Sequence, residues 1–146
     1  MPYKSMQIAK FMVDVCLKSG TPITNIKLQA AMYRVQRTFL KNGQGRAFFE
    51  DIEAWVFGPV VPNVYFMFCG FGANDIWLSY PDAEKDIERT DQNIIRKTAL
   101  ETAAEKPWDI QKDVCRKNGA WAETYADGFG NHRIIPTDGI AIEEKM

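Results

Sequence analysis

Hydrophobic residues recur at intervals of three and four along the first part of the chain. Ile8, Phe11 and Val15 fit this spacing, which predicts an amphipathic helix over residues 5–18 with Ser5 as its N-cap. After a turn at residues 20–23, the spacing resumes and predicts a second, longer helix. The N-terminal half of the chain is therefore expected to be helical.

The second helix is expected to start at Thr24 or Asn25 and to run to about Lys41, with Asn42 and Gly43 ending it. At about 100° per residue its side chains separate into sectors. The apolar sector holds Leu28, Met32, Val35 and Phe39. A basic sector, roughly 90° or more away, holds Lys27, Arg34, Arg37 and Lys41, and it is bordered by Ile26, Ala30 and Tyr33. We therefore expect one buried face and one basic, tyrosine-edged ridge that faces solvent or a partner.

The rest of the chain alternates short β signals with further helices. The pattern predicts a short strand within residues 48–56, a turn at Gly58-Pro59 and a short helix ending at Phe68. Residues 76–80 are expected as a brief strand or an extended loop, and residues 81–89 as a solvated acidic segment. Further predicted elements are helices over 90–104 and 107–116, a helical turn over 121–125, an extended segment at 134–136 and a last helical turn from 137.

Together these elements predict a mainly α (α+β) fold. We expect a compact bundle of about five to six helices with a short strand or hairpin around residues 47–57. At 146 residues the chain has the size of one domain, spanning residues 1–146, and 46% hydrophobic with 25% charged residues is ordinary for a globular protein. No apolar run approaches the roughly 20 residues of a membrane span, and the N-terminal residues lack a secretory pattern. A cytoplasmic protein without membrane contact is expected.

Charge is distributed unevenly although the net charge is only −1. Residues 1–50 have eight Lys/Arg against two Asp/Glu, residues 51–91 have two against eight, and residues 92–146 have eight against nine. This suggests a dipolar molecule or two segments that pair with each other. The basic helix face then has several interpretations: a solvated surface, a surface for an acidic partner, a ridge for phosphates, or an internal match to residues 51–91.

Candidate catalytic groups are few. Three separated cysteines (Cys16, Cys69, Cys115) and the single His132 fit neither a disulfide framework nor zinc-ligand spacing. Reduced cysteines are the simplest interpretation, and catalysis by a Cys115–His132 pair remains the alternative. The acidic group at Glu50, Asp51 and Glu53 is a weak cation site at most. With no phosphate loop or nucleophile elbow, we expect no enzymatic activity, no metal and no cofactor.

The densest segment covers residues 52–65, which combine Trp55, a Gly58-Pro59 pair and Tyr65. Trp55 is interpreted first as a core residue, and second as a half-exposed anchor for a partner, because tryptophan, tyrosine and arginine are enriched at interface hot spots.

Two sequence blocks resemble a known family. The first is residues 22–29 (Pro-Ile-Thr-Asn-Ile-Lys-Leu-Gln) with Tyr33 and Gln36; the second is residues 52–55 (Ile-Glu-Ala-Trp), 58–61 (Gly-Pro-Val-Val) and 64–65 (Val-Tyr). Weaker matches are Ala120-Trp121, Tyr125 and residues 134–136. The chain thereby resembles the Panacea domain family of SocA-like antitoxins and GepA-like phage-associated proteins. Residues 70–118 lie outside the matching blocks, and Ala120 stands where the family usually has proline or a small polar residue.

The resemblance implies a mostly helical domain without catalytic activity. Members of the family neutralise a partner toxin by direct binding, or act as proteolytic adaptors that deliver the toxin to a protease, and many are encoded in prophage or toxin–antitoxin loci. A protein partner is therefore expected, of unspecified identity and with no oligomeric state implied. The candidate partner-binding residues are Lys27, Gln29, Tyr33, Arg34, Arg37, Lys41, Trp55 and Tyr65. The alternatives are a nucleic-acid-binding regulator that uses the basic helix 24–41, and a phage-encoded inhibitor of a host defence protein.

Overall fold

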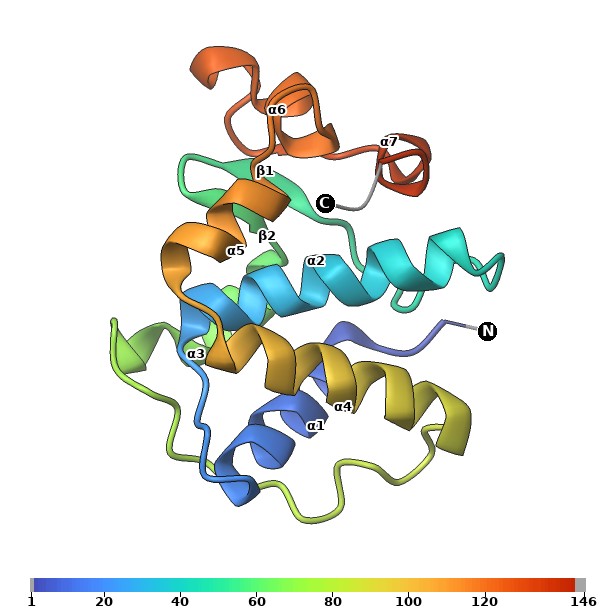
Figure 1. Ribbon diagram of the computed structural model, residues 1–146, viewed down its shortest axis with the longest axis vertical. Helices are drawn as coiled ribbons and strands as arrows, with labels where there is room; N and C mark the ends of the chain where they lie inside the picture. The colour runs from blue at the N-terminus through green and yellow to red at the C-terminus, as the bar shows by residue number, and fades with distance from the viewer. Residues whose placement is uncertain (1, 144–146) are drawn as a thin grey trace.

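The computed structural model describes residues 2–143, and 56% of these residues are helical. Within that range lie seven α-helices, two short 3-10 helices and a small antiparallel sheet (Figure 1), so the predicted mainly α (α+β) class is confirmed. The helices are α1 (Ser5–Lys18), α2 (Asn25–Lys41), α3 (Pro62–Phe68), α4 (Arg89–Ala104), α5 (Pro107–Val114), α6 (Ala120–Tyr125) and α7 (Thr137–Ala141). The 3-10 helices are η1 (Cys69–Phe71) and η2 (Ala126–Gly128).

The first two helices have the predicted bounds, but only one of the two predicted caps forms. The Thr24 hydroxyl accepts a hydrogen bond from the Lys27 N–H at 3.3 Å, as an N-cap does. In α1 the N-cap position belongs to Lys4, and the Ser5 hydroxyl instead accepts a hydrogen bond from Asn63 at 2.9 Å. Ser5 therefore links α1 to the start of α3 rather than capping the N-terminus of its own helix.

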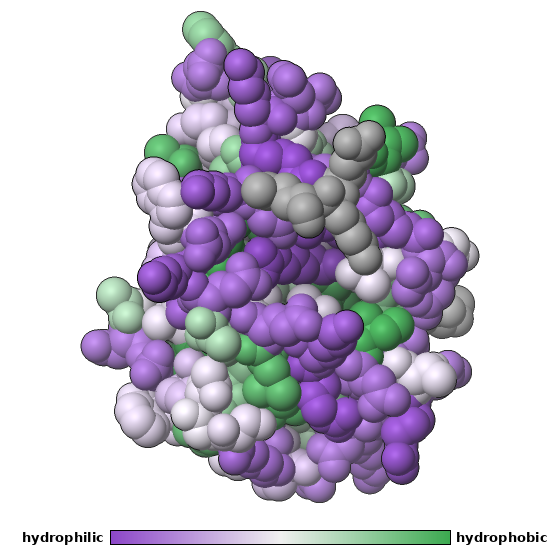
Figure 2. Space-filling model, in the orientation of Figure 1, coloured by the Kyte–Doolittle hydropathy of each residue, from purple (hydrophilic) through white to green (hydrophobic). Residues whose placement is uncertain are grey.

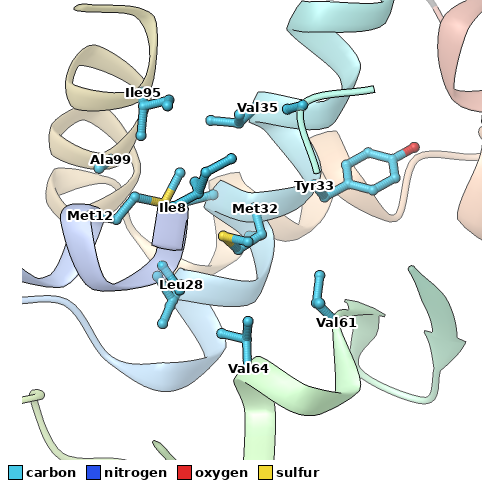
Figure 3. Packing of buried hydrophobic residues seen from close by; sticks show 14 of the residues in the cluster. Ile8, Met12, Leu28, Met32, Tyr33, Val35, Val61, Val64, Ile95 and Ala99 are labelled. Carbon is cyan, nitrogen blue, oxygen red and sulfur yellow. The ribbon is translucent and has the colours of Figure 1, made fainter. Parts of the chain in front are cut away.

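Helix α2 lies at the centre of the molecule (Figure 1). Helices α1 and α4 pack along one side, and α3, the sheet, α5 and α7 cover the others. The apolar sector of α2 is buried as predicted. Its Leu28 and Met32 side chains belong to the same buried cluster as Ile8 of α1 and Ile95 of α4 (Figure 3). The hydrophobic core therefore forms where α1, α2 and α4 come together.

The sheet has the order β2-β1-β3 and is antiparallel throughout. Its strands are β1 (Glu53–Trp55), β2 (Gly58–Val60) and β3 (Arg133–Ile134). Trp55 pairs with Gly58, so the hairpin turn is formed by residues 56–57, and the prediction of a turn at Gly58-Pro59 is wrong. Gly58 has a φ of +141°, which other residues rarely adopt, so glycine is needed to start β2 rather than to make the turn.

Several smaller boundaries differ from the predicted ones. Residues 76–80 form an extended loop rather than a strand, held by a 3.0 Å hydrogen bond from the Ile76 N–H to the Ile23 carbonyl. Helix α4 begins at Arg89, with Glu88 instead of Thr90 at the N-cap position, and α5 ends at Val114 rather than at residue 116. Such shifts of one or two residues at helix ends leave the arrangement of the elements unchanged.

Among residues 2–143, no helix has the length and apolar character that crossing a membrane requires. The face drawn in Figure 2 is mainly hydrophilic, with apolar side chains confined to separate patches. Larger exposed apolar patches on such a surface mark places where a partner can bind.

The core contacts of α4 predict a specific loss of stability. Replacing fully buried Ile95 with alanine should lower the free energy of unfolding by about 2–5 kcal/mol, because a cavity remains between α1, α2 and α4. Urea denaturation measures the effect. The control is Lys97→Ala on the exposed side of the same helix, which should change stability by about 0.5 kcal/mol or less. Equal effects of the two substitutions would contradict this packing.

Candidate protein-binding surface

The basic sector of α2 is turned into the molecule. Tyr33 is fully buried and Arg37 nearly so, while Arg34 is largely covered. The expectation that this ridge faces solvent or a partner is therefore wrong for these three residues. The cause is the second half of the chain, since α4, α5 and the segment up to Glu143 lie over this face of the helix.

Arg37 is neutralised by two carboxylates from distant parts of the chain. Its guanidinium binds Asp113 of α5 in a two-pronged arrangement, with Nη1–Oδ1 and Nη2–Oδ2 distances of 3.0 and 2.7 Å. Its Nη1 also lies 2.6 Å from Oε1 of Glu143. The other Glu143 oxygen accepts hydrogen bonds from the Tyr33 hydroxyl at 2.9 Å and from the Ala120 N–H at 2.8 Å. Glu143 thus joins α2 to the first turn of α6.

Arg34 extends this ion network toward α4. Its Nε lies 2.8 Å from Asp113, and its two terminal nitrogens bind Glu105 at 2.6 and 3.1 Å. Arg116 also binds Asp113. Burial alone would raise the pKa of Asp113, but hydrogen bonds and attraction from the three arginines outweigh it and hold that pKa well below its usual range.

The two lysines of the basic sector also have partners within the chain. Lys27 Nζ donates to the Ala103 carbonyl at 3.0 Å, and Lys41 Nζ to the Ala141 carbonyl at 3.3 Å. Both acceptors lie in the last turn of a helix, α4 and α7, where a positive charge is favourable. All four basic residues of the sector therefore bind groups of this chain, and in this conformation they are not arranged to follow a phosphate backbone.

Gln29, another candidate for partner binding, is buried and forms hydrogen bonds that link α2 to α3. Its Oε1 accepts from the Val61 N–H at 2.9 Å, and its Nε2 donates to Asn25 at 3.0 Å. Asn25 in turn donates to the Tyr65 carbonyl at 3.0 Å. These bonds fix the N-cap residue and the first turn of α3 against α2, so Gln29 positions Tyr65 rather than meeting a partner.

Trp55 and Tyr65 do lie together, as members of an aromatic cluster. The cluster consists of Trp55, Phe57, Tyr65, Phe66 and His132. His132 stacks on Trp55 with ring centres 4.4 Å apart, and Tyr65 meets Trp55 edge-on at 5.1 Å. Trp55 and Tyr65 are half-buried, whereas Phe66 is 60% exposed. The cluster is a satellite of the core with one side open to solvent.

The backbone under this cluster is held firmly. Trp121 Nε1 donates to the Trp55 carbonyl at 2.8 Å, and Trp121 stacks on Tyr125 with ring centres 4.8 Å apart. Trp55 Nε1 donates to Glu53 at 2.9 Å. Helix α6 therefore packs against β1 and holds the backbone of Trp55 in place.

An apolar groove of about 600 Å³ lies beside the cluster, with Phe57 belonging to both. It runs between the start of α2, the β1–β2 hairpin and α5. Its apolar walls include Ile26, Ala30, Pro59, Ile110 and Val114. Cluster and groove therefore adjoin at Phe57.

Phe57, Phe66 and His132 were not among the predicted site residues. A signal existed for Phe66: Val64 and Phe68 lie four residues apart on α3 and are buried, so residue 66 between them points away from the core. For His132 there was none, because it reaches Trp55 only through the pairing of β3 with β1.

The groups considered for catalysis or metal binding are engaged separately. Burial raises the pKa of the Cys115 thiol to about 12, so it stays protonated near neutral pH, while His132 stacks on Trp55. Asp51 pairs with Arg46 at 2.9 Å, and Glu50 accepts from the Ser5 N–H at 2.8 Å. Within residues 2–143, no group of three or more His, Cys, Asp or Glu side chains is placed to hold a metal ion.

The chain matches no family model, no curated protein and no solved structure. The candidate surface is aromatic and apolar, and hydrogen bonds to α3 and β1 hold it in place.

The ion network predicts a large loss of stability when one partner is removed. Arg37→Ala leaves Asp113 and Glu143 buried with fewer counter-charges, and should lower the free energy of unfolding by about 3–5 kcal/mol. Chemical denaturation measures it. The matched control is Arg46→Ala, which removes the exposed pair with Asp51 and should cost about 1 kcal/mol or less. Similar losses in both variants would contradict the network's burial.

The depressed pKa of Asp113 predicts a particular pH dependence. A carboxyl whose pKa is lower in the folded state stabilises the fold above its unfolded pKa of about 3.9. That contribution is lost as the pH falls further toward the folded pKa. The stability difference between the wild type and Asp113→Asn should therefore be constant from pH 7 to about 5 and shrink by up to about 1.4 kcal/mol per unit well below pH 3.9. Denaturation curves at a series of pH values test this, and a difference that does not shrink in acid would refute it.

Proposed function

We propose that this chain is a protein-binding module that neutralises a toxin or delivers a partner to a protease, as its resemblance to the Panacea domain family implies. The main support is the apolar surface formed by the aromatic cluster and the adjacent groove. Tryptophan and tyrosine are the residues most enriched among interface hot spots. Burying a side chain as exposed as Phe66 would contribute about 1.5–3 kcal/mol to binding.

The rigidity of this surface also supports binding. Asn25 and Gln29 fix α3, and Trp121 fixes β1, so the rings are ordered before any partner arrives. A surface that is already ordered loses less conformational entropy on association.

The two sequence blocks behind the resemblance form one structural unit. Residues 22–36 supply Asn25 and Gln29, and residues 52–65 supply the groups that these side chains hold, the Val61 N–H and the Tyr65 carbonyl. Both blocks therefore contribute residues to the same exposed corner.

The alternative of a nucleic-acid-binding regulator has less support. It depended on a free basic face along residues 24–41, and Arg34 and Arg37 are instead ion-paired within the chain.

The proposed compartment is the cytoplasm, because Cys69 is exposed and forms no disulfide, as is usual for thiols in a reducing environment.

The proposal is tested with the product of the neighbouring gene. The two proteins are co-expressed and co-purified, and the toxicity of the neighbour is measured with and without this chain. We expect a stable complex and relief of toxicity. A neighbour that is harmless alone and does not bind would remove the antitoxin interpretation.

The aromatic cluster predicts which substitution weakens the complex. Phe66→Ala should reduce affinity at least tenfold, about 1.4 kcal/mol or more, without lowering the thermal midpoint, because the ring is largely in solvent. Calorimetric titration measures the affinity. Trp77→Ala is the control, since Trp77 is 67% exposed but belongs to neither the cluster nor the groove. An equal loss of affinity in both variants would place the binding surface elsewhere.

A further inference from the structure

Phe129 has the most exposed large hydrophobic side chain in the described part of the chain, at 91%. It lies in the segment between α6 and β3, residues 126–132, called here the Phe129 loop. In Figure 1 this segment forms the end of the molecule, at the top of the view. A single exposed apolar residue is common on protein surfaces, so the exposure gains meaning only from the backbone beneath it.

The second half of that backbone is held by hydrogen bonds. Five consecutive N–H groups, from Phe129 to Arg133, each donate to a backbone carbonyl. The acceptors are, in order, Ala126 at 3.1 Å, Tyr125 at 2.8 Å, Gly128 at 3.2 Å, Ala54 at 2.7 Å and Gly130 at 2.9 Å. The Phe129 loop therefore has one defined shape, unlike an exposed loop whose backbone is left to water.

The shape is also strained. Ala126, Asp127 and His132 have φ values of 48°, 57° and 69°, in the left-handed region that non-glycine residues seldom adopt. At Gly130 a Cβ atom would lie 1.7 Å from the Thr124 carbonyl oxygen, so no other residue fits there. Strained backbone persists where the surroundings impose it, and it is concentrated at functional sites.

The far end of the loop is attached to the aromatic cluster. His132 stacks on Trp55, and its N–H donates to the Ala54 carbonyl next to that tryptophan. Phe129 is therefore attached, through His132 three residues later, to strand β1, which also carries Trp55 of the cluster.

We infer that Phe129 is an anchor that inserts into an apolar pocket of the protein partner, beside the contact made by the aromatic cluster. The inference rests on the proposed protein-binding function and deepens it by stating the shape of the partner: concave and apolar opposite this loop. Asp127 is the acidic side chain of the loop; Glu123 of α6 is exposed before it and Arg133 of β3 after it, so acidic groups outnumber basic ones among these three. The pocket is therefore expected to be flanked by a basic group, and an anionic lipid surface is disfavoured.

The experiment uses the purified neighbouring-gene product and the full chain, with affinity measured by calorimetric titration. Phe129→Ala should weaken binding at least tenfold with an unchanged thermal midpoint, and Phe129→Leu should recover part of the loss. The control is Ile142→Ala, which removes a side chain that is 81% exposed after α7 and should leave affinity unchanged.

Gly130→Ala tests the role of the rigid backbone. It keeps the phenylalanine but cannot keep the loop conformation, so affinity should fall about as far as with Phe129→Ala. Wild-type affinity in this variant would contradict the role given to the loop's shape.

The outcomes separate this inference from the proposed function. If Phe66→Ala weakens the complex and Phe129→Ala does not, the anchor is wrong and the protein-binding module stands. If the wild type does not bind the neighbouring product, both fall. Sedimentation with phosphatidylcholine and phosphatidylglycerol vesicles covers the membrane alternative, and vesicle binding that is lost in Phe129→Ala would overturn the inference.

Discussion

The enclosure of α2 on nearly all sides is the constraint on which the rest of the structure depends. A helix in this position cannot leave its guanidinium groups in a medium of low polarity without counter-charges. Asp113 meets this need for three arginines at once, and Glu105 and Glu143 complete the network. These carboxylates come from the end of α4, from α5 and from the segment after α7, so the ion network joins three later parts of the chain to α2.

The same helix also supports the exposed surface. Nearer the N-terminal end of α2, Asn25 and Gln29 hold Val61, which follows the hairpin, and α3 by hydrogen bonds to the backbone. Because those bonds go to backbone groups, they fix the position of the cluster without restricting which side chains stand on it. A corner built in this way can present different rings to different partners while its support stays the same, which agrees with function residing in sites placed on a fold.

The helices were predictable from the sequence because apolar spacing reports directly on which side of a helix faces the core. The helical wheel separated the basic sector of α2 from the apolar one, but a wheel cannot show that other elements cover the basic sector, so the prediction that it faces solvent or a partner was wrong for Tyr33, Arg34 and Arg37. The net charges of the segments were also a poor guide to pairing. They suggested the acidic residues 51–91 as the partner, but Arg34 and Arg37 pair with carboxylates from residues 92–146, where charges nearly balance. Trp55 and Tyr65 were identified because they are close in sequence, whereas His132 joins them only through strand pairing.

Glu143 also has a consequence for how the chain is made. Arg37 and Glu143 are 106 positions apart, and a ribosome adding about 5–20 residues per second needs roughly 5–20 seconds to pass from one to the other. Until Glu143 is added, the arginines of α2 lack part of their counter-charge, and burying α2 at the centre of the fold is energetically unfavourable. The complete ion network around Arg37 therefore forms only when nearly all of the described chain has been synthesised.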